Sequence, residues 1–266
     1  MKYLLLAVIF ISATSLFAQS ADPLNPGRVL YPEQAGLIGG VGILTQTGEF
    51  NVTCDCPAFD GGRGTGFLIG AIYERDLFRQ VAWGAALLYQ HRPFEALYRE
   101  TELVPVRSAE TERNYEAPLD FRNTASARFS YLTLMPFIKY IQFQPLFLRG
   151  GIGLTTIVSG NLLHSKELLT KTVRSPEGRL ETVSMVDENG QPRENLAIIE
   201  DNEFPALNAF QLSLEPAIGV DIKLGKSSWY LAPVFQYSLP LTIISENGNN
   251  FKLSAWQITG EIRYIF

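Results

Sequence analysis

The sequence has few of the residues that build reactive sites. Only two histidines and two cysteines occur among its 266 residues, and the formal net charge is −5. Neither His91 nor His164 forms a recognisable pair with a nucleophile, and neither lies near the cysteines in sequence. The sequence therefore predicts no catalytic residues, no metal site and no cofactor, and hence no enzyme. The mildly negative charge argues against a nucleic-acid partner.

Long apolar runs are missing after the first residues. Residues 131–141 come closest, but this run is short and contains Pro136 and Lys139, so it does not predict a membrane-spanning helix. In residues 1–18, Lys2 precedes an apolar run and then small and polar residues. This pattern predicts a secretory signal peptide, cleaved after Ala18 or two or three residues later. Residues 19–35 contain three prolines and are expected to form a periplasmic leader without strands.

Alternation of apolar and polar residues dominates the remainder. In residues 251–266, one face carries Trp256, Ile258, Gly260, Ile262, Tyr264 and Phe266, and the other carries Gln257, Thr259, Glu261 and Arg263. A strand between lipid on one side and a wet lumen on the other has this pattern. Similar runs occupy residues 36–47, 64–77, 81–91, 128–143, 146–159, 210–224, 228–242 and 252–266. Several of these runs reach the length that a tilted membrane strand requires.

The connections between these strands alternate in length. Three are tight turns, whereas residues 92–127 and 160–209 are expected to form long outer loops, the second with a hairpin at its Ser-Pro-Glu-Gly turn. Short periplasmic turns, long outer loops and an even strand number are the rule for outer-membrane barrels. The sequence thus predicts an all-β fold: an eight-stranded antiparallel up-and-down transmembrane β-barrel over residues 36–266. Its place would be the outer membrane of a diderm bacterium, with both termini in the periplasm.

Three prolines fall inside predicted strands. Pro136, Pro216 and Pro233 all have lipid-facing parity in this reading. Because proline lacks the N–H that a ladder bond requires, each position predicts a bulge or a local break in the ladder.

Charged residues also occur on the lumen-facing side of the predicted strands. They are Glu74, Lys139, Arg149, Glu215, Asp221, Lys223, Glu261 and Arg263. Opposite charges in a narrow lumen should pair, because an unpaired charge there loses its hydration. We therefore expect a balanced ionic network that closes the periplasmic half; the alternative is that positions near the water boundary are simply polar.

Bulky residues share the same inward parity. Phe129, Tyr131, Met135, Phe137 and Tyr230 fit an eight-stranded barrel whose interior is filled by side chains. The sequence therefore predicts a plugged lumen and not a general-diffusion porin.

The only two cysteines are Cys54 and Cys56, in the first expected outer loop. The oxidising compartment that an exported protein meets favours a disulfide. A Cys-x-Cys bridge closes a small strained ring, however, so the sequence leaves both the paired and the unpaired state open.

Several segments together carry a resemblance to a known family. They are the signal segment, Cys54-Asp-Cys56-Pro57, the run Gly-Thr-Gly-Phe-Leu-Ile-Gly-Ala-Ile-Tyr-Glu at residues 64–74, and Gly-Glu-Ile-Arg-Tyr-Ile-Phe at residues 260–266. With them the chain resembles the small outer-membrane β-barrel proteins related to the barrel of outer-membrane protein A and to the PorT-like group.

The resemblance implies a structural or partner-binding role through the outer loops. It further implies contact with outer-membrane lipid, recognition by the barrel-assembly machinery, and an assembly signal formed by Gly260, Tyr264 and Phe266. Two alternatives are an accessory barrel of a protein secretion machinery and, less favoured, a lipid-modifying enzyme that would require a catalytic pair.

Overall fold

The described part of the chain is a closed, eight-stranded antiparallel β-barrel. A computed structural model describes residues 32–52, 57–78, 80–108, 110, 113–143, 145–170, 172–175, 178–185 and 196–266. The expected signal peptide, nearly all of the expected leader, and Cys54 and Cys56 lie outside these residues. The barrel strands are β1 (Glu33–Phe50), β2 (Arg63–Phe78), β3 (Val81–Ser108), β4 (Asn114–Phe143), β5 (Leu146–Leu168), β9 (Phe210–Val220), β11 (Trp229–Pro240) and β12 (Gly248–Ile265).

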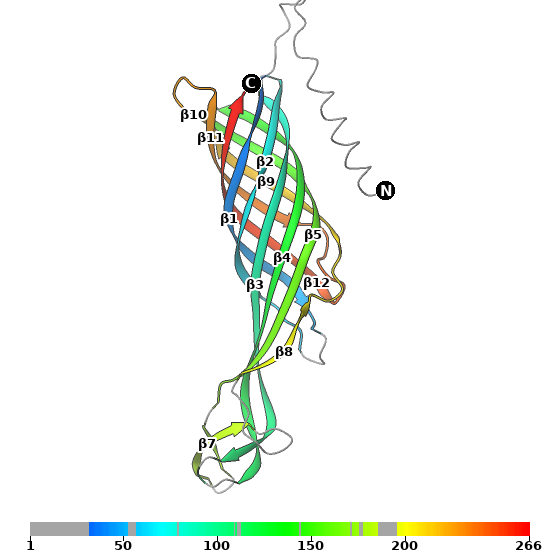
Figure 1. The fold of residues 1–266 in the computed structure, drawn as a ribbon, viewed down its shortest axis with the longest axis vertical. Coiled ribbons are helices and arrows are strands. Elements are labelled where there is room, and N and C mark those ends of the chain that lie inside the picture. Colours follow the sequence, from blue (N-terminus) through cyan, green and yellow to red (C-terminus); the bar gives the residue numbers. More distant parts are fainter. Residues whose placement is uncertain are drawn as a thin grey trace, which may run out of the picture. The chain divides into compact units, whose positions relative to one another are not determined.

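These strands pair in chain order, and the circle closes between the first and the last. Strand β12 pairs with β1 from Gln34↔Ile265 to Phe50↔Gly248, so the barrel has no open edge (Figure 1). The predicted all-β, eight-stranded, up-and-down fold is confirmed. Strand β1 begins at Glu33, so the barrel takes in the last residues of the segment expected to be a leader without strands.

The two expected long loops are largely strand. Strands β3 and β4 pair without a gap from Val81↔Tyr140 to Arg107↔Asn114, so most of residues 92–127 form a hairpin. The alternation continues there: Phe94 and Ala96 are buried, whereas Glu95 and Leu97 are exposed. The second expected loop, 160–209, contains the end of β5 and three further strands, β6 (Thr172–Arg174), β7 (Leu180–Met185) and β8 (Leu196–Glu203). Strands β6 and β7 form the hairpin predicted at the Ser-Pro-Glu-Gly turn.

These strand ends build an extension, hereafter called the ribbon. It comprises residues 95–108 of β3, 114–126 of β4 and 163–168 of β5, together with β6, β7 and β8. Strand β7 pairs with β3, and β8 pairs with β5. The ribbon projects from the barrel at the end opposite Phe266 (Figure 1). The other end, here called the turn end, carries the short connections, and there the N–H of Phe266 donates to the carbonyl of Glu33 at 3.1 Å.

The outer wall of the barrel is apolar. Exposed aliphatic side chains include Leu37, Val41, Ile69, Leu87, Leu134, Ile138, Leu148, Ile152, Leu214, Ile218, Ile258 and Ile262. Aromatic pairs flank this band: Trp229 with Tyr264 and Tyr73 with Trp83 toward the turn end, Phe67 with Tyr89 and Tyr237 with Trp256 toward the ribbon. An apolar band between two aromatic girdles is the exterior of a membrane-spanning barrel.

The three strand prolines lie where the ladder is interrupted. Pairing of β4 with β5 passes from Leu134↔Leu154 directly to Phe137↔Gly151, which skips Pro136. Pairing of β9 with β11 skips Pro216 and begins only after Pro233. All three prolines are exposed on the outer wall, so the lost ladder bonds fall at the predicted positions.

Candidate functional site

The lumen near the turn end is filled by a square of alternating charges. Lys139 Nζ lies 2.8 Å from Glu74 Oε1 and 2.6 Å from Asp221 Oδ2. Arg263 Nη1 lies 2.8 Å from Glu74 Oε2, and its Nη2 contacts Asp221 Oδ1. The side chains come from β2, β4, β12 and the link between β9 and β10 (Ile222–Lys223). Except for Asp221, at 16% exposure, they are at most 1% exposed, so each charge depends on its partner rather than on water.

A second ion pair extends this square toward the middle of the barrel. Arg149 Nη1 lies 2.5 Å from Glu261 Oε1, and Arg263 Nε lies 3.4 Å from Glu261 Oε2. Arg149 also donates through Nη2 to Gln236 Oε1 at 3.1 Å. Glu261 therefore joins both arginines, and six of the eight charges expected in the lumen form one connected network: Glu74, Lys139, Arg149, Asp221, Glu261 and Arg263.

The other two expected members are not ion-paired within the described residues. The Glu215 carboxylate is buried and accepts hydrogen bonds from Ser213 at 2.6 Å, Ser238 at 2.8 Å and Gln236 at 2.8 Å. Lys223 has the inward parity of its strand but lies exposed in β10 at the turn end. Water solvates its ammonium group there, so it needs no carboxylate.

Toward the ribbon the lumen is filled by rings. Phe50 lies 5.4 Å from Phe59, 5.0 Å from Phe251 and 5.2 Å from Phe204 between ring centroids. Phe94 and Phe129 complete this group of six, hereafter the aromatic plug. Of the residues that the sequence placed inside, Phe129, Tyr131, Met135 and Phe137 are buried and Tyr230 is half-buried. Sequence reasoning missed the other five rings, although Phe94 continues the alternation of its strand.

The ribbon has a small core of its own. It consists of Val106, Ala117, Leu119, Phe121, Leu168, Val173 and Val183, from β3, β4, β5, β6 and β7. An extension with its own buried side chains holds a fixed surface, in place of the long outer loops predicted over residues 92–127 and 160–209.

Ion pairs cover the outside of the ribbon. Lys166 Nζ lies 3.1 Å from Glu100 and 2.6 Å from Glu102, and Arg122 pairs with Glu167. Partial burial raises the pKa of the Glu100 carboxyl, but hydrogen bonds from Lys166 and Asn123 outweigh it, and the pKa ends below its usual value. Burial, with Glu100 and Glu102 nearby, raises the pKa of the Tyr98 phenol to about 12.

The two histidines lie apart. His164 is a buried residue of the ribbon, with Nε2 3.1 Å from Asn123 Oδ1 and its ring edge-on to Phe59. His91 lies against the ring of Phe67 on the outer wall, with 5.5 Å between ring centroids. No group of three His, Cys, Asp or Glu residues able to hold a metal ion occurs among the described residues.

The three residues expected to act as an assembly signal lie on the outer face of β12 or just after it. Tyr264 is exposed against Trp229, and Phe266 is 58% exposed. Gly260 lies opposite Gly39 of β1 and Pro233 of β11.

No family model and no curated protein matches the chain. Similar folds are found among solved structures. Ail, the attachment invasion locus protein of Yersinia pestis, is 11% identical, with a TM-score of 0.32 over 87% of this chain and 99% of Ail. OprG from Pseudomonas aeruginosa is 13% identical, with a TM-score of 0.33 over 87% and 96%. AlkL is 11% identical, with a TM-score of 0.37 over 89% and 90%. These are small outer-membrane β-barrels. For this chain, the closed ladder itself establishes the barrel.

Proposed function

We propose that this protein is a non-conducting outer-membrane barrel that holds the ribbon outside the cell as a binding surface. The observation that carries the proposal is the ribbon itself, because it continues three barrel strands beyond the aromatic girdle and buries its own apolar core. A barrel that served only as a membrane anchor would not need such an extension.

The filled lumen supports the non-conducting part of the proposal. The ionic network occupies the turn end and the aromatic plug occupies the ribbon end, so two unrelated kinds of packing block the same path. An eight-stranded barrel has an interior just wide enough for its side chains.

The orientation follows from the connections. Short connections and both ends of the described strand circle lie at the turn end, which in barrels of this kind faces the periplasm. The ribbon would then face the medium, as the expected signal peptide and outer membrane require. The barrel-assembly machinery would meet Gly260, Tyr264 and Phe266 from the periplasm and lipid sides.

Catalysis has no part in the proposal. His91 lies against Phe67 on the outer wall, and His164 lies within the ribbon with Nε2 3.1 Å from Asn123 Oδ1, so the two histidines do not share a site. No observation favours the secretion-accessory alternative over a binding role.

Two measurements test the proposal. A peptide tag inserted in the β3–β4 turn at Glu110 should bind antibody on intact cells, and the purified protein should give no stable conductance steps in planar bilayers. Antibody access only after permeabilisation would refute the orientation, and regular channel openings would refute the plugged lumen. Loss of heat-modifiable gel mobility in the tagged protein would show that the insertion had disturbed the barrel.

A further inference from the structure

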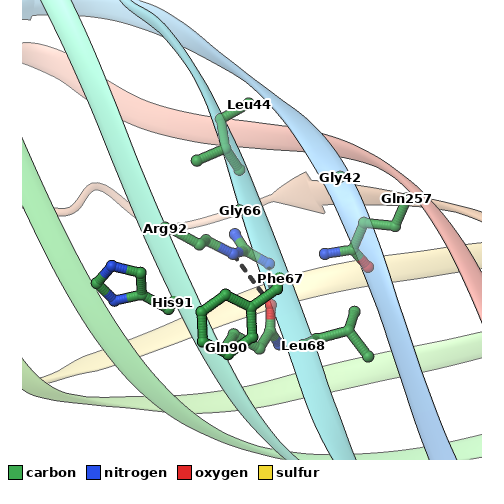
Figure 2. A pocket seen from close by; sticks show the side chains of 9 residues that line it. All are labelled: Gly42, Leu44, Gly66, Phe67, Leu68, Gln90, His91, Arg92 and Gln257. Carbon is green, nitrogen blue, oxygen red and sulfur yellow. Dashed lines mark hydrogen bonds between the residues drawn. The ribbon is translucent and has the colours of Figure 1, made fainter.

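A small cavity lies within the barrel wall between Gln90, Arg92 and Gln257 (Figure 2). Its volume is about 10 Å³, room for one sphere the size of a water molecule. The Arg92 guanidinium beside it donates to Gln90 Oε1 at 3.0 Å and lies 5.2 Å from the centre of the Tyr131 ring. This cavity is therefore too small for any partner larger than water.

The ribbon, in contrast, has two sheet edges without a neighbouring strand among the described residues. Its strand order is β6, β7, β3, β4, β5, β8, so β6 and β8 lie at the edges. Strand β6 has three residues, whereas β8 has eight, from Leu196 to Glu203. Figure 1 shows β8 beside β5 where the ribbon leaves the barrel. An open edge of this length is a template for another strand, because its outward N–H and C=O groups lack partners.

The pairing with β5 determines which backbone groups of β8 point away from the sheet. The N–H of Phe204, directly after the last residue of β8, donates to the carbonyl of Gly160 at 2.9 Å. In an antiparallel ladder, residues bonded to the neighbouring strand alternate with residues whose N–H and C=O point the other way. Asn202 therefore bonds to β5, and the backbone groups of Asp201 and Glu203 point to the open edge.

The same two residues carry negative side chains. Asp201 and Glu203 are exposed, and neither has an ion pair among the described residues. They lie two residues apart on one strand, so both side chains project from the same face of the sheet. Ile198, 66% exposed, lies on this face too, because its partner Ser165 is two residues from Leu163, the partner of Asp201. The open edge thus combines two carboxylates at alternate positions with an exposed apolar side chain.

We infer that β8 binds an extended, basic segment of a partner protein, which joins the ribbon as a further strand. Lysine or arginine at alternate positions of that segment would lie opposite Asp201 and Glu203, where opposite charges on neighbouring strands stabilise the pairing. Backbone hydrogen bonds to the edge provide affinity that does not depend on side chains, and the two carboxylates select against acidic segments. The inference rests on the proposed binding role of the ribbon and names the chemistry of its partner.

The test uses the whole protein in a non-ionic detergent and a short labelled peptide in which lysine alternates with threonine. Its binding, followed by fluorescence anisotropy, should saturate and should weaken as the salt concentration rises, because salt screens exposed charges. The same peptide with every backbone nitrogen methylated keeps all charges but cannot donate to a strand, so it should bind about tenfold more weakly or not at all. A peptide with glutamate in place of lysine should not bind.

A pair of matched variants makes the test specific. Asp201→Asn combined with Glu203→Gln removes both charges from the edge and should weaken binding about tenfold. Glu49→Gln combined with Glu116→Gln removes two exposed carboxylates elsewhere and should leave the affinity unchanged. Heat-modifiable gel mobility checks that both variants are folded.

Three results would overturn the inference: a wild-type protein that does not bind the peptide, equal binding of the methylated peptide, or an edge variant that binds as tightly as the wild type. With the tag at Glu110 accessible on intact cells, such a result would leave the proposed function standing. A tag reached only after permeabilisation would instead refute the proposed function.

Discussion

The two halves of the lumen are both filled by side chains, but one half is filled by charged residues and the other by aromatic rings. At the turn end, six charges occupy the interior, and each depends on its oppositely charged partners. At the ribbon end, six phenylalanine rings occupy it, and each contributes largely through its own buried area. The difference shows that the interior of a narrow barrel can be filled either by specific pairing or by bulk. The two halves should therefore respond differently to the same kind of substitution.

The largest effect is expected from Arg263→Ala. Three carboxylates lose contact with this guanidinium, and buried charges left without a partner are costly. We expect a loss of about 5 kcal/mol in the free energy of unfolding, measured by denaturant titration in detergent. Lys223→Ala removes a cation at the exposed rim and should be nearly neutral. Equal effects of the two variants would mean that the network contributes no more than a solvated charge.

A smaller effect is expected in the aromatic plug. Phe94→Ala removes one ring from a cluster of six and leaves a cavity, which should destabilise the barrel by about 3 kcal/mol in the same titration. Phe94→Leu should recover much of this loss, because bulk rather than a specific partner is what the position needs. A Leu variant as unstable as the Ala variant would contradict that view.

Removing both partners of one ion pair tests whether the charges themselves or only their pairing stabilises the barrel. Arg149→Met combined with Glu261→Leu replaces both partners with apolar side chains of similar volume, and such exchanges are often close to neutral. We expect a change of about 1 kcal/mol, with Glu261→Leu alone much worse because Arg149 then stays buried without its carboxylate. A double variant worse than either single variant would show that the charges themselves are needed.

The smallest effect concerns the ribbon, outside both plugs. Because the pKa of Glu100 lies below its usual value of 4.5, its pairing with Lys166 stabilises the ribbon above that pH and is lost as the pH falls through the lower, folded-state value. Pepsin should therefore cleave Glu100→Gln faster than the wild type near pH 4.5, and the ratio of the two rates should approach one at lower pH. A constant ratio would contradict a role for the ionised carboxylate.

The positions of the barrel strands, and the face on which each strand residue lies, were the features best predicted from the sequence. Alternation alone located all eight barrel strands, the outward prolines and six charges that meet inside. It failed beyond His91, where the sequence predicted a long outer loop. Strands β3 and β4 instead continue their ladder there, with polar residues on the outer face of the ribbon. The sequence did not predict which charged residues pair. Glu74 and Arg263, for example, are far apart in sequence. Glu215 has the same inward parity as the others, but it accepts hydrogen bonds from hydroxyl and amide groups instead of pairing with a cation.

The contribution of β12 to the lumen has a consequence for the order of folding. Arg263 and Glu261 both lie on this strand, whereas their partners Glu74, Asp221 and Arg149 lie earlier in the chain. If the sheet closed before β12 was added, Arg149 would be buried without Glu261. Glu74 and Asp221 would then have Lys139 as their shared partner, without Arg263. Closure of the barrel without β12 is therefore energetically unfavourable. Addition of β12 completes both the pairing with β1 and the ion pairs of the lumen in a single step.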